Sequence, residues 1–338
     1  MGQANVPTIE DVARRAGVSV GTVSNVLSNA RFVRLATRAQ VEQAIQELGF
    51  RPNRLARALV SRRTNTIGLV LPDIANPFFA ELARGAEDIL GEQDYVVVLG
   101  NSDNDPRKEQ RYLSNFDDRR IDGIIVVIAA ASDAADVRGL ANQLPTVAVD
   151  RTVPRWRGDT VVGDNRLGMS LAVKHLAELG HDRLAFIDGD SRLSTASERH
   201  DGFLQAVETA GLQVHSYSEG AFTFESGFAQ GEALLRGANR ATAVCAANDL
   251  LALGVLSAAL EHGCRVPDDL SVVGYDDIAY ARLASPGLTT VRQPAYDMGT
   301  AAARLLLGRL AGARRRSRHL VMEPSLMIRA STTAPRGG

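Results

Sequence analysis

Carboxylate and amide side chains recur directly after short apolar runs in the larger, C-terminal part of this sequence. Such groups accept and donate hydrogen bonds, which suits a polyhydroxylated ligand such as a sugar, with arginine and aromatic faces completing the contacts. For about half of them, capping a following helix or forming a turn is the alternative role. The residues are Asp73, Asn101, Asp103, Asp150, Asp188, Asp190, Asn248, Asp249, Asp276 and Asp277.

The apolar runs that precede these side chains predict parallel β-strands. Short β-branched runs alternate with helical stretches, which is typical of parallel sheets covered by helices on both faces. The runs are numerous enough for two doubly wound lobes. In such sheets the ligand crevice lies at the carboxyl ends of the strands, where the polar side chains fall. The runs are TIGLVLPD, YVVVLGNSD, GIIVVIAA, PTVAVD, RLAFIDGD, AVCAAND and LSVVGYDD.

The competing interpretation of this region is an α/β enzyme that acts on sugars or nucleotides with an aspartate as general base. The sequence contains no nucleophile elbow, no phosphate-binding P-loop, no dinucleotide fingerprint and no zinc-protease motif. Its six histidines show no metal-ligand spacing with Cys245 or Cys264. We therefore expect no catalytic residues, no cofactor and no metal.

Composition points to a cytoplasmic protein. Of 338 residues, 45% are hydrophobic and 23% are charged, as in an ordinary globular chain. The N-terminus lacks the apolar block of a signal peptide, and no run approaches the roughly 18 apolar residues of a membrane span. The two cysteines are expected to be small packing residues in a reducing compartment.

Charge is unevenly distributed along the chain. Residues 1–63 contain ten arginines and four acids, a net charge of +6, whereas the whole chain carries −1 and the remainder therefore −7. A basic N-terminal part on an acidic body favours a nucleic-acid contact confined to one end. A solvated charged face is the alternative.

Three short helices are predicted in this basic part. A capping box of Thr8 and Asp11 starts the first, and Gly17 ends it. Ser19 caps the second, and a second box of Thr37 and Gln40 starts the third. Two short helices joined by a glycine turn and braced by a third form a helix-turn-helix. The apolar stripes are Ile9, Val12, Ala13 and Ala16, then Val20, Val23, Val26 and Leu27, then Val41, Ala44, Ile45 and Leu48.

The second helix is slim enough to enter a DNA major groove. Val20, Gly21 and Asn25 fall on the face that the apolar stripe leaves free. There, Asn25 could bond adenine and Val20 could touch a thymine methyl group. Short hydroxyl side chains are available for backbone phosphates: Thr8, Ser19, Thr22, Ser24 and Ser28. A helical subdomain with another partner is the alternative.

The following segment, RPNRLARALVSRR, combines arginines with isolated leucines. Pro52 and Asn53 suit the start of a helix. A short basic helix that carries Leu59 suits a minor groove, where an apolar wedge can part a base step. A plain charged linker is the alternative.

These motifs together resemble the LacI/GalR family of bacterial transcription regulators. The resemblance is carried by TIEDVARRAGVSVGTVSNVLSN, LGFRPNRLARALVSRRTNTIGLVLPDIANPFF and VVGYDDI. It implies a dimer on a near-palindromic operator, with hinge helices in the minor groove and Leu59 in the central step. Further DNA contacts are then Asn53, Arg54, Ala56 and Arg57. Many members have arginine at Asn25 and a larger polar residue at Gly21, so guanine readout at Asn25 is not expected.

The resemblance also implies an effector domain similar to periplasmic sugar-binding proteins. Arg199 and Asp276 would contact ligand hydroxyl groups, and Phe222 would stack on the ring. The remaining pocket residues would be Asn76, Phe78, Asp150 and Asn248. The alternatives are a surface ion pair of Arg199 with Glu198 or Asp201, and a core position for Phe222.

The complete expectation is an all-α helix-turn-helix head followed by an α/β effector domain of two parallel-sheet lobes. The expected domains are residues 1–51, a hinge helix at 52–63, an effector and dimerisation domain at 64–332, and a tail at 333–338. The chain would cross between lobes near Gly163, Gln293 and Glu323. Because the tetramerising helix of some members is absent, we expect a homodimer. It would be a sugar-controlled repressor; control by a partner protein is the remaining alternative.

Overall fold

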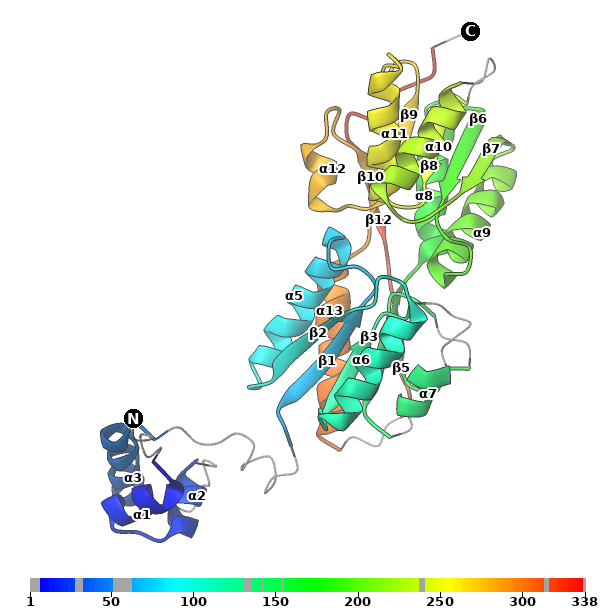
Figure 1. Cartoon of the computed structure of the whole chain (residues 1–338). Helices are drawn as coiled ribbons and strands as arrows, with labels where there is room; N and C mark the ends of the chain where they lie inside the picture. Colours follow the sequence, from blue (N-terminus) through cyan, green and yellow to red (C-terminus); the bar gives the residue numbers. More distant parts are fainter. Residues whose placement is uncertain are drawn as a thin grey trace. The chain divides into compact units, whose positions relative to one another are not determined.

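A computed structural model describes residues 7–27, 33–50, 63–129, 135–141, 143–152, 155–236, 241–312 and 316–336. The contacts divide the chain into two compact units, residues 1–64 and residues 65–338 (Figure 1). Each unit has its own apolar core.

In the part of the first unit that the structure describes, three helices pack as a bundle, and the first two begin where the sequence predicts. It consists of α1 (Ile9–Ala16), α2 (Val20–Leu27) and α3 (Leu35–Leu48). Both halves of the Thr8–Asp11 capping box form, and Gly17 adopts the left-handed conformation, with φ of 66°. Its core consists of Val12, Ala13, Val23, Val26, Val41 and Ala44.

The predicted start of the third helix is wrong. Thr37 lies inside α3, which begins at Leu35, and Arg34 occupies the capping position without a side-chain hydrogen bond. A Thr-x-x-Gln pattern identifies a helix start only where the preceding residues leave the helical conformation. Here Leu35 and Ala36 are already helical, so the pattern falls within the first turns of the helix.

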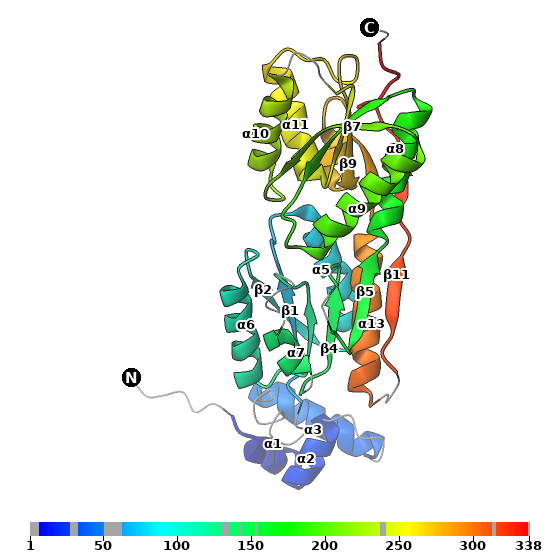
Figure 2. The same ribbon diagram turned by 90° about the vertical axis from the view of Figure 1, so that its right-hand side faces the viewer.

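The second unit contains two six-stranded sheets, one in each lobe (Figures 1 and 2). All seven apolar runs form strands. Every pairing is parallel except that of β10 with β12. The first sheet has the order β11 (His319–Met322), β5 (Asp159–Gly163), β4 (Thr146–Val149), β3 (Gly123–Val126), β1 (Thr66–Leu71), β2 (Val96–Asn101). The second has the order β12 (Ser325–Met327), β10 (Thr289–Arg292), β9 (Ser271–Asp276), β8 (Ala243–Ala246), β6 (Arg183–Asp188), β7 (Gln213–Glu219).

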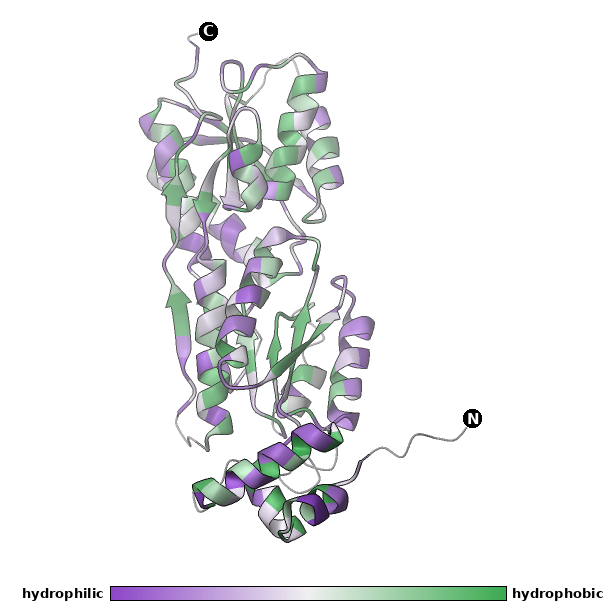
Figure 3. Ribbon diagram, turned by 90° about the vertical axis from the view of Figure 1, so that its left-hand side faces the viewer, coloured by the Kyte–Doolittle hydropathy of each residue, from purple (hydrophilic) through white to green (hydrophobic). Residues whose placement is uncertain are grey.

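Helices cover both faces of each sheet, so both lobes are doubly wound. In Figure 3, green apolar strands lie beside helices that carry both green and purple residues. The first lobe carries α5 (Pro77–Gly91), α6 (Pro106–Asp118), α7 (Ala135–Ala141) and α13 (Ala295–Leu310). The second carries α8 (Asn165–Glu178), α9 (Ser194–Thr209), α10 (Phe224–Leu235), α11 (Asp249–Glu261) and α12 (Ala279–Leu283).

The chain crosses between the lobes three times, at the expected positions. Gly163 ends β5 of the first sheet, and α8 of the second lobe follows. Gln293 follows β10 of the second sheet and precedes α13, which packs on the first. Glu323 separates β11 of the first sheet from β12 of the second. Three short crossings allow the lobes to move as bodies about a shared hinge.

Candidate functional site

The residues of α2 that are predicted to read DNA bases lie on its exposed surface. Val20, Gly21, Ser24 and Asn25 are exposed, whereas Val23 and Val26 are buried against the other two helices. A Cβ atom at Gly21 would meet only the hydroxyl of Ser19, at 3.8 Å. Packing within this unit therefore does not require glycine at position 21. The absence of a side chain there is not explained by a contact inside the described bundle.

Two of the hydroxyl side chains assigned to phosphates also hold helix ends. Thr8 Oγ1 accepts from the Asp11 amide at 3.3 Å and donates to Asp11 Oδ2 at 2.7 Å. The Thr8 amide also donates to Asp11 Oδ2, at 3.0 Å, and this bond together with the one from the Thr8 hydroxyl lowers the pKa of Asp11. Ser19 Oγ accepts from the Thr22 amide at 3.1 Å and lies 3.0 Å from Thr22 Oγ1. A phosphate would therefore meet these groups at the amino ends of helices, where the dipole favours an anion.

Several predicted DNA contacts lie outside the described residues. They are Ser28 and the hinge-helix residues Asn53, Arg54, Ala56, Arg57 and Leu59. Their roles remain predictions.

All seven predicted effector residues line one cavity between the two lobes of the second unit. The cavity has a volume of about 90 Å³. Asn76, Phe78 and Asp150 come from the first lobe, and Arg199, Phe222, Asn248 and Asp276 come from the second. Asp73, Phe79, Asn104, Arg151, Thr195, Ala221 and Thr223 complete the lining.

Arg199 is held in this cavity by buried partners. Its guanidinium donates to Asn165 Oδ1 at 2.9 Å and to the carbonyl of Ala247 at 2.6 Å, and lies 3.4 Å from Asp276 Oδ1. The alternative surface pairing is wrong. Glu198 accepts from Asn165 instead, and Asp201 pairs with Arg166.

Of the three carboxyl groups that line the cavity, those of Asp150 and Asp276 are buried. Burial raises the pKa of Asp276 to about 6, although Arg199 opposes this shift. Burial also raises the pKa of Asp150, against the attraction of Arg151 and Arg199. Asp150 Oδ1 has no hydrogen-bond partner in the described structure. A buried acceptor without a partner is costly unless a ligand supplies a donor.

The two predicted amides have a shared geometry. Asn76 Oδ1 accepts from the Phe78 amide at 3.0 Å, and Asn248 Oδ1 accepts from the Leu251 amide at 2.9 Å. Each amide thus caps a helix, α5 or α11, through its oxygen. The NH₂ group of each remains available as a donor to a ligand. Capping and ligand binding are therefore not alternatives here.

Phe222 lies both in the core and at the cavity, the two positions that the sequence left as alternatives. Its ring packs against the apolar core of the second lobe and covers Gly189, where a Cβ atom would collide with it. The same side chain lines the cavity, with the Arg199 guanidinium carbon 5.9 Å from its centroid.

The sequence interpretation missed Arg151. This arginine directly follows Asp150 and is buried, donating to Asn104 Oδ1 at 2.8 Å and to the carbonyls of Ile128 and Ala129. Burial lowers its pKa to about 10. Its position directly after Asp150 is the sequence signal that could have identified it as a cavity residue.

Gln293 was predicted only as a hinge residue. Its Nε2 donates to Asp276 Oδ1 at 2.8 Å, and its Oε1 packs against Gly163 at another crossing. It therefore joins a pocket carboxylate to the hinge.

Of the polar residues at strand ends, Asp73, Asp150, Asn248 and Asp276 line the cavity. Others have structural roles. Asp249, for example, accepts from Thr290 Oγ1 and from the Ile278 amide, and Asp277 pairs with Arg292 and Arg329.

The described residues contain neither a membrane-spanning helix nor a metal-binding cluster. No helix there combines the length and apolar character that a membrane crossing requires. No group of three or more His, Cys, Asp or Glu side chains there is arranged to hold a metal ion.

Comparisons with known proteins identify the family. Residues 8–53 match the model of "bacterial regulatory proteins, lacI family", and residues 173–332 match a periplasmic binding protein-like domain. The chain is 38% identical over 331 residues to the HTH-type transcriptional regulator DegA of Bacillus subtilis, covering 96% of this chain and 98% of that one. This chain belongs to the lacI family of bacterial regulatory proteins.

Other comparisons agree with this lacI-family assignment. The ribose operon repressor of Bacillus subtilis is 39% identical over 302 residues, covering 89% of this chain and 91% of that repressor. A crystal structure of the lac repressor dimer bound to operator and the anti-inducer ONPF superposes with a TM-score of 0.88. It is 29% identical and covers 97% of this chain and 99% of that one. The protein is accordingly a DNA-binding repressor of the lacI family and not an enzyme.

Proposed function

We propose that this repressor binds a sugar between the two lobes of its second unit and that the sugar changes its affinity for operator DNA. The observation that carries the proposal is the unpartnered Oδ1 of the buried Asp150, which lines the same cavity as Arg199 and Asp276. A cavity that contains a buried acceptor without a donor is prepared for a ligand that carries hydroxyl groups.

The composition of the cavity supports a polyhydroxylated ring. Two carboxylates accept from hydroxyl groups, the Arg199 guanidinium donates to ring and hydroxyl oxygens, and aromatic rings such as Phe222 cover an apolar ring face. The relative named for the ribose operon gives independent support for a sugar.

The ligand would act by linkage between the lobes. Asp150 lies on one lobe and Arg199 with Asp276 on the other, so a ligand that contacts all three favours one arrangement of the lobes. Gln293 connects this site to the crossings at residues 163 and 293. A ligand that prefers one arrangement shifts every equilibrium coupled to it, including DNA binding.

We further propose a homodimer on a near-palindromic operator in the bacterial cytoplasm, with Asn25 and Val20 reading bases. Exposed apolar side chains lie on the edge strand β2 (Val96, Val98 and Leu99) and on α12 (Tyr280 and Leu283, the latter 79% exposed). Apolar side chains grouped on two elements favour burial against a second copy. Association of the lac repressor as a dimer supports the same assembly.

A thermal-shift screen of the full-length protein against sugars and nucleobases tests the ligand class. A ligand bound only by the folded state raises the melting temperature. We expect a specific rise with one group of sugars, and no rise with the same sugars for Asp150→Asn. A rise with nucleobases alone would refute the sugar assignment, and no rise with either panel would favour control by a partner protein.

Selection of DNA fragments by the purified protein tests the operator function. We expect one near-palindromic sequence to be enriched, and the active sugar to change the amount recovered. Enrichment that is the same with and without the sugar would contradict the linkage.

A further inference from the structure

A second cavity lies in the first lobe, away from the ligand pocket. It has a volume of about 460 Å³, within the roughly 300–1,000 Å³ range of small-molecule sites. It is formed by α7, the start of β4, the segment before β5, the end of α13 and Ser317. Asp150, which lines the ligand pocket, follows the carboxyl end of β4. Thr146, which lines the second cavity, begins that strand, so the two cavities lie at opposite ends of the strands.

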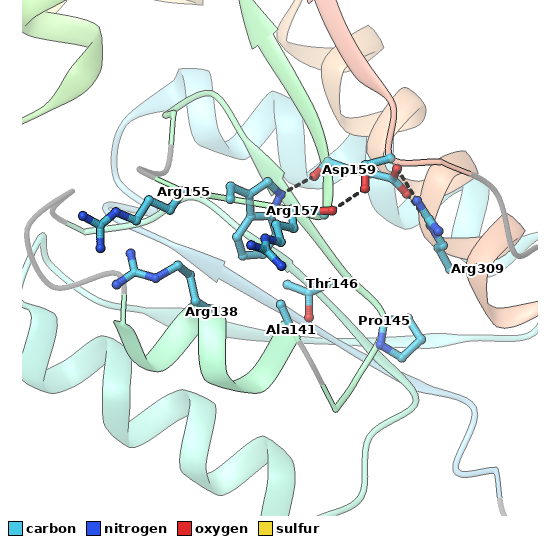
Figure 4. Close-up of a pocket in the computed structure, with 11 residues that line it drawn as sticks. Arg138, Ala141, Pro145, Thr146, Arg155, Arg157, Asp159 and Arg309 are labelled. Carbon is cyan, nitrogen blue, oxygen red and sulfur yellow. Dashed lines mark hydrogen bonds and ion pairs between the residues drawn. The ribbon is translucent and has the colours of Figure 1, made fainter.

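The lining of this cavity is strongly basic. Arg138, Arg155, Arg157 and Arg309 all contribute to it, and Asp159 is its single acid (Figure 4). In Figure 4, Arg138 and Arg155 lie together on one side, and Arg309 lies against Asp159 on the other. This concentration of arginine contrasts with the net charge of −7 carried by residues 64–338.

The carboxylate of Asp159 is bound by groups other than Arg155 and Arg157. Arg309 binds its carboxylate with two hydrogen bonds, of 2.8 and 2.7 Å, and the Arg318 amide adds a third of 2.8 Å. In the described part of the chain, neither Arg155 nor Arg157 forms an ion pair with a carboxylate. Guanidinium groups that share a cavity repel one another unless an anion lies between them.

Trp156 supplies a rigid wall to the same cavity. Its Nε1 donates to the Asp159 carbonyl at 3.0 Å, and its ring covers Gly158, where a Cβ atom would lie 2.8 Å from the ring. The ring is thus fixed beside the arginines. Guanidinium groups bind phosphate oxygens in pairs of parallel hydrogen bonds, and an indole face can cover an organic group.

We propose that this cavity is a second ligand site, which takes a small phosphorylated compound with two or more negative charges. Arg155 and Arg157 bind the phosphate groups, Arg138 completes the basic wall, and Trp156 covers the remainder of the ligand. The site shares no lining residue with the sugar pocket. It therefore does not depend on the proposed sugar specificity.

The chain contains a single tryptophan, which makes the test specific. Trp156 fluorescence of the full-length protein is titrated with pyrophosphate and with ATP, against sodium chloride at matched ionic strength. We expect a saturable change with the phosphates and none with chloride. Arg155→Gln/Arg157→Gln should weaken binding by at least about tenfold, because each lost charge-assisted hydrogen bond removes a measurable part of the affinity.

A matched control removes an exposed arginine elsewhere. Arg119→Gln, at the end of α6, should leave the titration unchanged. Unaltered circular dichroism and melting of the double variant establish that it folds. No saturable change with either phosphate, or an equal loss in Arg119→Gln, would overturn the proposal.

Operator DNA is another source of phosphate groups, and its salt dependence separates the two sources. A free ligand leaves the slope of log K against log salt unchanged in the double variant. If each arginine instead contacted the DNA backbone, the slope would fall by about one per arginine, which would overturn the proposal.

Discussion

Arg199 of α9 and Asp276 at the end of β9 face each other at 3.4 Å, with side-chain exposures of only 4% and 6%. Asp150 of the other lobe lies close enough to raise the pKa of Asp276. One buried guanidinium therefore balances carboxyl groups from both lobes. The side chain that we propose to contact the ligand is therefore also one on which the stability of the lobe depends.

Replacement of Arg199 by methionine should destabilise the second unit by about 3–5 kcal/mol, because it leaves buried carboxylates without their cation. Urea unfolding at pH 7.5 measures the change. The control is Arg166→Met, whose ion pair with Asp201 is about half exposed. That variant should lose no more than about 1 kcal/mol, and equal losses in the two variants would contradict the role assigned to Arg199.

Sugar affinity should fall as the pH is lowered through about 6. The pKa of Asp276 is raised to about 6, so the carboxylate that accepts from a ligand hydroxyl becomes protonated below that pH. Calorimetric titration between about pH 5 and 8 with the sugar found in the screen measures the effect, which can approach tenfold per unit below the pKa. Asp276→Asn should bind more weakly and lose this dependence on Asp276. Affinity that rises on acidification would show that protonated Asp276 binds instead.

Gly21→Ala should stabilise α2 and weaken operator binding. Alanine gains at most about 1 kcal/mol over glycine within a helix, and less is expected here because Gly21 is the second residue of α2. The added methyl group meets only Ser19, at 3.8 Å. The methyl group would, however, stand on the surface that we place in the major groove. Hydrogen exchange of the α2 amides and operator titration measure the two effects.

Gly17→Ala is the matched comparison for that experiment. Gly17 has φ of 66°, so alanine there should destabilise the same bundle by about 1 kcal/mol. If Gly21→Ala instead binds operator as tightly as the parent protein, α2 does not approach DNA at this position.

Helix α13 should tolerate no side chain at Gly299, where it meets α5 most closely. A Cβ atom at Gly299 would collide with the Leu82 carbonyl oxygen, so Gly299→Ala should cost about 1–3 kcal/mol in urea unfolding. Gly308 lies on the same helix with no atom within 4 Å of its Cβ position. Gly308→Ala should therefore stabilise the protein by about 0.5–1 kcal/mol. Similar effects of the two substitutions would rule out the close contact.

The three described helices of the first unit and seven of the twelve described strands of the second were predictable because their signals are local. The other five strands, β5, β7, β10, β11 and β12, were not predicted. Thr8 with Asp11, and Ser19 before a valine stripe, specify helix starts through groups only three residues apart. Continuous apolar runs specify buried parallel strands in the same way. The Thr37 prediction shows the limit, since a local pattern was outweighed by helical residues before it.

The sequence by itself therefore determined the helix-turn-helix, the two lobes and, through its family motifs, seven of the side chains that line the cavity between the lobes. Only the tertiary structure decided that Arg199 pairs with Asp276 rather than with its neighbours Glu198 or Asp201. It alone brought Arg138, Arg155 and Arg157 together with Arg309 around a second cavity. Burial and electrostatic pairing depend on distances in space, and those distances are set by packing among residues far apart in the chain.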